Sequence, residues 1–411
     1  MTEPFILGVN YWPRRKAMGW WRDFDPGEAR DEFALIRDLG LRAVRLFLLW
    51  DDFQPQADQV APTALARLVQ VADLAAEHEL RLDVTFFTGH MSGSNWAPGW
   101  LLDERLPPPA ASGPVVSGGR VVASGYRNPY VDAQALRAER LLIRTVVGAL
   151  RDHPAIWLWN LGNEPDVFAL PPDADSGPMW VRTMTAAIRD VDDRHLVTCG
   201  LHLANLVADN GLRIDRIFET ADLATAHPYP LYTDWANGPL DPDFAPFCSA
   251  VTASLAGRPV LVEEFGACTT SPGQPSRVRT WIAAGTERRQ FMASEEAAAE
   301  YIAAVLPRLV EVGALGALIW CFADYHRSLW ERPPFQDARH ERFFGLIRPD
   351  GSLKPHALIL RDFAATHPVV QPAPAHARMT IDPDTFYRDP MAHLPGLYRQ
   401  FREHQRIPPK S

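Results

Sequence analysis

Cysteine is scarce in this sequence, with four residues in 411: Cys199, Cys248, Cys268 and Cys321. They are widely separated and form neither a CxxC pair nor a Cys/His spacing typical of a metal site. Three of them lie in or beside apolar runs, where a cysteine usually behaves as a small buried hydrophobe. We therefore predict free thiols, no disulfides and no metal site.

Excess positive charge and long apolar runs are also lacking. The formal net charge is −9, and no run of Lys and Arg could neutralise a row of phosphates, which argues against a nucleic-acid partner. No stretch approaches the ~18 consecutive apolar residues of a membrane span. The start, MTEPFILGVNYWPRRK, has no basic segment before its short apolar run, unlike a signal peptide. We expect a cytoplasmic protein without a membrane partner, and the oligomeric state cannot be read from the sequence.

The composition, with 47% hydrophobic and 22% charged residues, is that of a soluble globular protein. Short apolar runs alternate with longer amphipathic segments, a pattern typical of a parallel sheet with crossover helices. The eight candidate strands span 5–12, 42–50, 81–88, 155–162, 196–202, 223–229, 259–265 and 314–322. Eight such strands can close a barrel, so we predict an α/β fold, a (β/α)8 TIM barrel, over residues 1–367.

The connections between these elements are unequal in length. The strand-to-helix segments 91–131, 266–292 and 323–354 are long, and in a (β/α)8 barrel such loops surround the active site. None of the strand-to-helix turns carries GxGxxG or a P-loop, which argues against a doubly wound nucleotide enzyme. Residues 368–411 form a Pro-rich C-terminal extension that is too small to be an independent domain.

Acidic residues stand where two of the predicted strands end. Glu164 ends the apolar run WLWNLGNEPD, and Glu263 and Glu264 end the run RPVLVEEFG. A buried carboxylate is costly unless it is used, although a helix cap at EPD would also explain Glu164. The apolar neighbours are expected to raise the pKa of Glu164, as a general acid requires.

Two carboxylates that face each other are the requirement for glycosidic bond hydrolysis. A separation of about 5–5.5 Å would predict retention of configuration. Because successive strand residues point to opposite sides, we expect Glu263 and Glu264 to differ in role, with one facing away.

Four motifs resemble those of clan A glycoside hydrolases, most closely glycoside hydrolase family 5. They are GNEPD at 162–166, AHPYP at 226–230, VEEFG at 262–266 and IWCF at 319–322, and they span the chain from the fourth strand to the eighth. The opening GVNYWP and the double-Glu EEFG are similar to branches of that family that act on β-mannosides.

The resemblance implies a role for each matching residue. Glu164 would be the acid/base and Glu264 the nucleophile, while Glu263 would be a support paired with a basic side chain behind the strand. Supporting or substrate-binding roles would fall to Arg45, His90, Asn163, His227, Tyr229 and Trp320. Among these, Asn163 would bind the 2-hydroxyl of the sugar, Arg45 would keep Glu264 ionised, and Trp320 would form the floor under the reacting sugar. His90 is as much a candidate for a structural role, and His202 carries still less weight.

Tryptophan is abundant, with 13 residues. Sugar rings pack on aromatic faces, so tryptophans near strand ends or on long loops are candidates for sugar subsites. The foremost of these are Trp12, Trp50, Trp96 and Trp100, and Trp235 and Trp330 belong to the same group. Core packing is the better explanation for any single one of them, whereas the group as a whole favours a sugar ligand.

The favoured hypothesis is a retaining, exo-acting β-mannosidase that cleaves small β-mannosides or manno-oligosaccharides and needs no cofactor or metal. An endo-β-1,4-mannanase and a β-glucosidase or endoglucanase remain alternatives within the hydrolases. The non-enzyme alternative is a carbohydrate-binding barrel that has lost catalysis, although such a barrel is expected to lack one of the two carboxylates.

Overall fold

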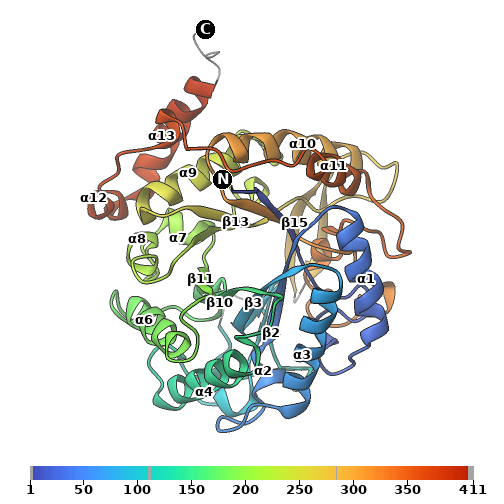
Figure 1. The fold of residues 1–411 in the computed structure, drawn as a ribbon, viewed down its shortest axis with the longest axis vertical. Coiled ribbons are helices and arrows are strands. Elements are labelled where there is room, and N and C mark those ends of the chain that lie inside the picture. The colour runs from blue at the N-terminus through green and yellow to red at the C-terminus, as the bar shows by residue number, and fades with distance from the viewer. Residues whose placement is uncertain (1–2, 110–112, 284, 406–411) are drawn as a thin grey trace.

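The computed structural model describes residues 3–109, 113–283 and 285–405. Its central sheet has eight strands in the order β11-β10-β3-β2-β1-β16-β13-β12, and the pairings are parallel. The strands are β1 (Ile6–Asn10), β2 (Ala43–Leu49), β3 (Arg81–Thr88), β10 (Ile156–Asn163), β11 (Leu196–Gly200), β12 (Ala224–Ala226), β13 (Val260–Phe265) and β16 (Gly316–Ile319). Each overlaps one of the eight predicted ranges. The (β/α)8 barrel is confirmed (Figure 1).

The two end strands of this sheet, β11 and β12, are joined mainly by threonine side chains. Thr198 Oγ1 donates to the carbonyl of Leu223 at 2.7 Å, and the N–H of Leu201 donates to Thr225 Oγ1 at 3.2 Å. Hydroxyl groups therefore bridge the seam where the ladder of backbone hydrogen bonds is incomplete.

Helices surround the sheet, each with its apolar face turned inward. They are α1 (Pro26–Asp38), α3 (Pro62–Glu77), α4 (Ala133–Leu150), α6 (Ser176–Arg189), α9 (Phe244–Ala256), α10 (Glu295–Glu311) and α11 (Pro355–Ala364). Side chains cap three of them, because Asp25, Asp132 and Ser294 accept hydrogen bonds from first-turn N–H groups. Such caps satisfy donors that a helix start leaves without a partner.

The barrel interior is layered. Leu158 of β10 packs with Leu223, Leu261 and Leu318, although β10 is not adjacent to β13 or β16 in the sheet. Two residues further along β10 and β13, Asn160 Nδ2 donates to Glu263 Oε1 at 2.8 Å. Because side chains two apart on a strand share a face, a polar layer lies above the leucine layer, toward the carboxyl ends of the strands.

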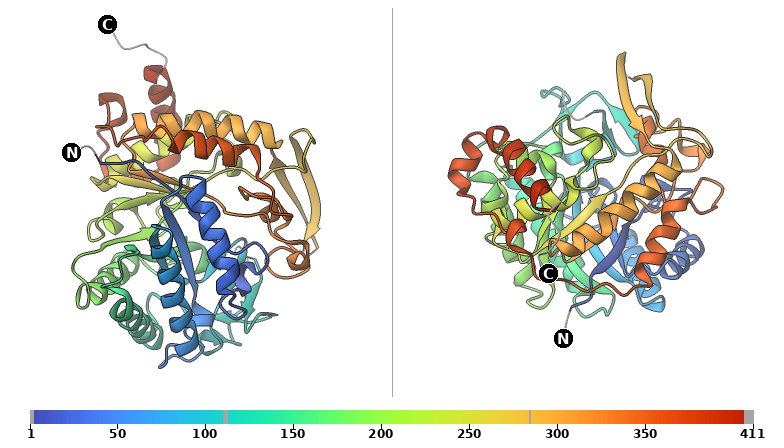
Figure 2. Two further views of the ribbon diagram at one scale, coloured as in Figure 1. Left: turned by 45° about the vertical axis from the view of Figure 1, so that its right-hand side comes forward. Right: turned by 90° about the horizontal axis from the view of Figure 1, so that it is seen from above.

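The long loops at these carboxyl ends contain their own small elements. The loop after β3 carries β4 (His90–Met91), β5 (Ser94–Trp96), η2 (Gly99–Leu101), β6 (Leu102–Asp103), β7 (Val115–Ser117), β8 (Arg120–Val122) and β9 (Gly125–Tyr126). The loop after β13 forms the antiparallel hairpin of β14 (Arg277–Ala283) and β15 (Thr286–Met292), which projects from the barrel (Figure 2). The loop after β16 contains η4 (Arg327–Leu329) and η5 (Arg339–Phe343).

The C-terminal extension packs against the barrel through aromatic side chains. It contains η6 (Ala375–Ala377), α12 (Pro383–Arg388) and α13 (Pro390–Gln405). Tyr387 Oη donates to the carbonyl of Asn205 at 2.9 Å, and the rings of Tyr398 and Phe247 lie 4.8 Å apart between centroids. These contacts hold the extension on the side of α7 (Leu203–Val207), α8 (Ile214–Ile217) and α9.

All four cysteines are buried and free, which confirms the prediction of free thiols. Within the described part of the chain, no helix has both the length and the apolar character needed to cross a bilayer.

Candidate active site

The structure brings the two predicted carboxylates together. Glu164 directly follows β10, and Glu264 lies near the end of β13. One carboxylate oxygen of each, together with a ring nitrogen of His227, lie within 4.8 Å of one another. These glutamates are 100 positions apart in the chain, but the barrel places the ends of β10 and β13 around one cavity.

Local irregularities in the backbone aim these side chains. Glu164 adopts a left-handed conformation, with φ 46° and ψ 57°, which costs free energy for a non-glycine residue and is typical of functional sites. The register of β13 against β16 shifts between Val262 and Phe265. A shift of this kind re-aims side chains near the end of a strand.

This shift overturns one expectation. Simple alternation predicted that Glu263 or Glu264 faces away, with Glu263 paired to a basic group behind the strand. Instead both contact the same guanidinium: Arg45 Nη1 donates to Glu264 Oε1 at 2.7 Å, and Arg45 Nη2 lies 3.2 Å from Glu263 Oε2. The expectation that one of them faces away is wrong because the register shift turns both carboxylates into the barrel, whereas the expected pairing of Glu263 with a basic side chain is present.

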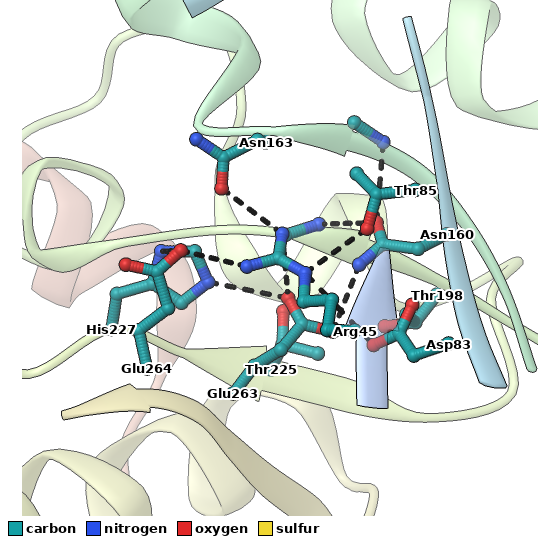
Figure 3. A network of polar contacts seen from close by, with 12 residues as sticks. Arg45, Asp83, Thr85, Asn160, Asn163, Thr198, Thr225, His227, Glu263 and Glu264 are labelled. Carbon is teal, nitrogen blue, oxygen red and sulfur yellow. Dashed lines mark hydrogen bonds and ion pairs between the residues drawn. The ribbon is translucent and has the colours of Figure 1, made fainter. Parts of the chain in front are cut away.

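Arg45 is the centre of a buried polar network (Figure 3). Besides the two glutamates, its guanidinium donates to Asn10 Oδ1, Thr85 Oγ1 and Asn163 Oδ1 at 3.0–3.2 Å. Burial lowers the pKa of Arg45, but the charges of Glu263 and Glu264 outweigh burial and raise it above its ordinary value. The guanidinium is therefore a permanent cation that fixes the positions of the groups around it.

His227 connects the acid pair to this network. Its Nδ1 lies 2.9 Å from Glu164 Oε1, and its Nε2 lies 3.2 Å from Glu263 Oε2. Burial lowers the pKa of His227, but the charge of Glu264 and the hydrogen bonds to Glu164 and Glu263 raise it to about 9. The imidazole therefore carries a proton at neutral pH and donates from both nitrogens.

The pKa of Glu164 is not raised by its apolar neighbours, as the sequence led us to expect. Burial does disfavour the charged form, but the charge of His202 and the hydrogen bond and charge of His227 outweigh burial and hold this pKa below its ordinary value. That expectation is wrong because it considered the strand before Glu164 and not the histidines that other strands bring to it.

Glu264 shows the opposite shift. Burial and the charge of Glu164 raise the pKa of Glu264, although His227, Arg45 and the hydrogen bond from Tyr229 oppose the shift. Tyr229 Oη donates to Glu264 Oε2 at 3.0 Å. The expected contact with Arg45 is present and lowers the pKa of Glu264 as expected, but burial and the charge of Glu164 outweigh it.

His202 and Asp166 form a pair that the sequence analysis missed. His202 Nε2 lies 2.9 Å from Asp166 Oδ2, and His202 Nδ1 lies 3.7 Å from Glu164 Oε1. Burial lowers the pKa of His202, but the charges of Asp166 and Glu164 raise it to about 9. The sequence does contain a signal for this pair, because Asp166 in the GNEPD motif is a second acidic residue close to Glu164.

His90 and Asn163 lie next to each other at the edge of the network. Asn163 Nδ2 donates to the carbonyl of His90 at 3.1 Å, while the His90 ring nitrogen Nδ1 lies 2.8 Å from Asn95 Oδ1. Burial lowers the pKa of His90, so its imidazole is neutral. Both residues line the cleft described next.

A cleft of about 980 Å³ opens above Glu164 and Glu264. Five residues predicted to bind or support the substrate also line it: His90, Asn163, His227, Tyr229 and Trp320. Further lining residues are His202, Tyr232, Trp235, Arg289, Gln290, His340, Glu341 and Met391. Loops from several strands, the β14–β15 hairpin and the start of α13 thus share in its wall.

Of the six tryptophans considered as sugar subsites, Trp235 lines this cleft, and the other five do not. Trp12 is buried and stacks on Phe47, with ring centroids 5.2 Å apart. Trp50 is buried against Trp100 at 5.5 Å, and Trp96 is also buried. The assignment of Trp12, Trp50, Trp96 and Trp100 to sugar subsites is therefore wrong. These side chains follow strands or lie on long loops, but they pack beneath the loops and do not face the cleft.

Glu164, His227 and Glu264 are also the group that, among the described residues, brings three ligand atoms near enough to surround a metal ion. However, both ring nitrogens of His227 already face carboxylates. This arrangement suits the sharing of a proton better than the binding of a cation, and we assign no metal to it.

Comparisons with known proteins agree with this geometry. A family model described as glycosyl hydrolases family 2, TIM barrel domain, matches residues 112–363. Among curated relatives, mannan endo-1,4-beta-mannosidase 4 of Oryza sativa subsp. japonica is 29% identical over 30% of this chain and 31% of its own length. Probable mannan endo-1,4-beta-mannosidase A-2 of Aspergillus terreus is 25% identical over 50% of this chain and 49% of its own length. The chain thus spans about a third to a half of these relatives.

Solved structures match over most of the chain. The exo-beta-1,4-mannosidase Op5Man5 from Opitutaceae bacterium strain TAV5 is 26% identical, with a TM-score of 0.71 over 89% of this chain and 60% of that one. GH5_18 from Streptomyces cattleya, in complex with GlcNAc, has a TM-score of 0.72 at 22% identity over 91% of this chain and 83% of that one, which shows the shared fold. The family model matches more than half of the residues. The chain therefore belongs to the family described as "glycosyl hydrolases family 2, TIM barrel domain", and with it to the clan A glycoside hydrolases.

Proposed function

We propose that the protein is a retaining glycoside hydrolase that removes the terminal sugar from small β-mannosides or manno-oligosaccharides. The observation that carries this proposal is the approach of Glu164 and Glu264, whose nearest oxygens lie within 4.8 Å across the cleft. Retaining enzymes hold their two carboxyl groups about 5–5.5 Å apart, whereas inverting enzymes need about 6.5–9.5 Å to admit a water molecule.

Glu264 is the proposed nucleophile. Arg45 and Tyr229 each donate to one of its oxygens, at 2.7 and 3.0 Å. These two bonds fix the plane of the carboxylate, so that an oxygen can attack the anomeric carbon of a sugar lying over Trp320. Arg45 also stabilises the negative charge on Glu264 when it is released in the second step.

Glu164 is the proposed acid/base, and His227 supplies its proton. The Nδ1–H of His227 donates to Glu164 Oε1 at 2.9 Å. A bound sugar displaces water from Glu164, and this raises the free energy of its charged form. The proton then moves across the existing hydrogen bond to Glu164 and on to the leaving oxygen, and Glu263 stabilises the imidazole from behind.

The choice of β-mannosides rests on the relatives. The curated relatives are named mannan endo-1,4-beta-mannosidases, and one solved structure is an exo-beta-1,4-mannosidase. The EEFG motif and the opening GVNYWP also favour the family 5 branches that act on these sugars.

Exo action is supported by a wall at one end of the cleft. The hairpin after β13 and the loop after β16 are joined there, because Trp281 Nε1 donates to the carbonyl of Asp337 at 2.7 Å. The ring centroids of Trp281 and His340 also lie 5.7 Å apart. Such a wall on the side of Trp320 would stop a polymer from passing through.

The test uses nitrophenyl β-mannoside, β-glucoside and β-galactoside with the wild type and with Glu264→Ala. We expect the wild type to cleave the mannoside best, and the variant to be inactive although folded. NMR should show β-mannose as the first product. If α-mannose appears first, the mechanism is inverting, and if no substrate in the panel is cleaved, the enzymatic proposal fails.

Product analysis on mannobiose and mannohexaose decides the mode of cutting. Exo action predicts release of mannose from both substrates, with a ladder of oligomers each shorter by one sugar. Early formation of mannobiose and mannotriose from the hexamer would instead indicate an endo-mannanase, which the names of the curated relatives favour.

A further inference from the structure

Glu341 is a cleft residue to which neither the motifs nor the proposed chemistry gives a role. It belongs to η5, in the loop after β16, and lines the cleft together with Trp320. Its side chain is only 11% exposed. A carboxylate that is largely withdrawn from water is costly unless hydrogen-bond donors satisfy it.

Glu341 has donors from the protein, but they do not use its full capacity. Trp320 Nε1 donates to its Oε2 at 3.3 Å, and Tyr232 Oη donates to its Oε1 at 3.4 Å. His340 Nε2 lies 3.3 Å from Oε1. An ionised carboxylate offers about four acceptor positions, and these bonds are long, so Glu341 retains acceptor capacity toward the cleft that it lines.

The strand order decides which part of a substrate would meet Glu341. Glu164 protonates the leaving oxygen, so the leaving group lies beyond β10, near His202 and α7. The attacked sugar would lie between Glu264 of β13 and Trp320, which directly follows the neighbouring strand β16. Glu341 is bonded to the edge of the Trp320 indole, and is therefore on the side of the attacked sugar.

The joined loops limit the space beyond this position. Trp281 of the hairpin packs near His340, the residue before Glu341 (Figure 2 shows the hairpin from two directions). In a pyranose ring, C4 lies opposite C1, and C6 is carried by C5, the ring neighbour of C4. A sugar whose C1 faces Glu264 and whose ring rests on Trp320 thus turns its 4- and 6-hydroxyl groups toward this wall.

We propose that Glu341 is a specificity-determining residue that accepts a hydrogen bond from the 4- or 6-hydroxyl group of the terminal sugar. This inference rests on the proposed function and adds a reason for exo action to it. A longer chain linked through the 4-hydroxyl could not donate from that oxygen, and its next sugar would meet the wall. A hydrogen bond to a charged acceptor discriminates strongly against an analogue that lacks the donor.

The test is a cycle between Glu341→Ala and deoxy substrates. The substrates are nitrophenyl β-mannoside and its 4-deoxy and 6-deoxy analogues, and kcat/KM is measured for the wild type and the variant. We expect the wild type to lose about 10- to 100-fold on one deoxy analogue. Glu341→Ala should lose a similar factor on the parent mannoside and show little further loss on that analogue.

Tyr232→Phe is the matched control, because it removes a donor to Glu341 and keeps the carboxylate. This variant should still distinguish the parent mannoside from the deoxy analogue. Where Glu341→Ala does not fold, Glu341→Gln takes its place, because glutamine keeps the size of the side chain and offers a weaker, neutral acceptor. That variant should show a reduced discrimination.

Two outcomes would overturn the inference. If Glu341→Ala lowers kcat/KM by the same factor on all three substrates, Glu341 only holds Trp320 in place. If the wild type cleaves the parent and both deoxy analogues equally well, the carboxylate contacts neither hydroxyl. A wild type that cleaves none of the mannosides would count against the proposed function itself, which separates the two failures.

Discussion

His227 places its Nδ1 2.9 Å from Oε1 of Glu164. The imidazole comes from the residue after β12 and the carboxylate from the residue after β10, so the barrel and not the local chain creates this pair. The hydrogen bond gives the acid/base candidate a partner that can hold or return a proton. Several expectations below depend on that partner and on Arg45.

The stability of the protein should fall between about pH 6.5 and pH 9. The pKa of His227 is raised to about 9: burial opposes its charge, but the charge of Glu264 and the hydrogen bonds to Glu164 and Glu263 favour it. The unfolded chain has the ordinary histidine pKa near 6.5. The stabilising contribution is therefore full below pH 6.5 and is lost as the pH rises to 9, on the order of 3 kcal/mol.

Urea unfolding across this pH range measures the effect. His227→Gln should flatten the decline, with His202 accounting for part of what remains, since its pKa is also raised to about 9. The exposed His326, in the loop after β16, provides the control, and His326→Gln should leave the slope unchanged. Equal slopes for the wild type and His227→Gln would contradict the prediction.

Variants of the two glutamates should differ in how they are rescued. Glu164→Gln should lose about 10²- to 10⁴-fold in turnover, the usual contribution of a general acid. Part of the activity should return with azide or with a substrate whose leaving group needs no proton. Glu264→Ala should not respond to a better leaving group, and any glycosyl azide that it forms should have the inverted configuration; it should also accept a glycosyl fluoride of inverted anomeric configuration. Identical behaviour of the two variants would mean that the roles are misassigned.

Replacement of Arg45 should impair both stability and activity. Arg45→Met leaves Glu263 and Glu264 without their shared cation in a buried site, and breaking a buried ion pair costs about 3–5 kcal/mol. Denaturant unfolding and kcat report the two effects. Arg144 forms an ion pair with Asp190 whose two side chains are 55% and 61% exposed. Arg144→Met should therefore change the free energy of unfolding by no more than about 0.5 kcal/mol.

Gly200 should tolerate no side chain. A Cβ atom there would lie 2.5 Å from the carbonyl oxygen of Gly162 and 2.7 Å from Nη2 of Arg45. Overpacking of this kind costs about 1–3 kcal/mol, and Gly200→Ala should also lower kcat at least about tenfold, because it displaces the guanidinium that holds Glu264. A Cβ at Gly19 meets nothing within 4 Å, so Gly19→Ala is the matched control. An active, stable Gly200→Ala would show that Arg45 can shift without consequence.

The fold could be predicted from the sequence to a large extent. Apolar-rich runs such as 81–88 and 259–265 fall on β3 and β13, because strands covered on both faces are mostly apolar and do not alternate. The C-terminal ends of the predicted strands 155–162 and 259–265 identified Glu164 and Glu264. The β14–β15 hairpin escaped prediction because its exposed, Arg-rich strands lack an apolar pattern.

The sequence by itself determined the eight strands and the carboxylates at their ends, since buried strands require apolar residues and the proposed chemistry requires carboxylates. Only the tertiary structure decided that Glu263 and Glu264 share Arg45 and that His202 and His227 flank Glu164. It also decided that Trp12 and Trp50 are packing residues and that Glu341 lies beside Trp320. The reason is that pKa shifts and cleft walls depend on groups brought together from distant strands, and a linear pattern does not record those distances.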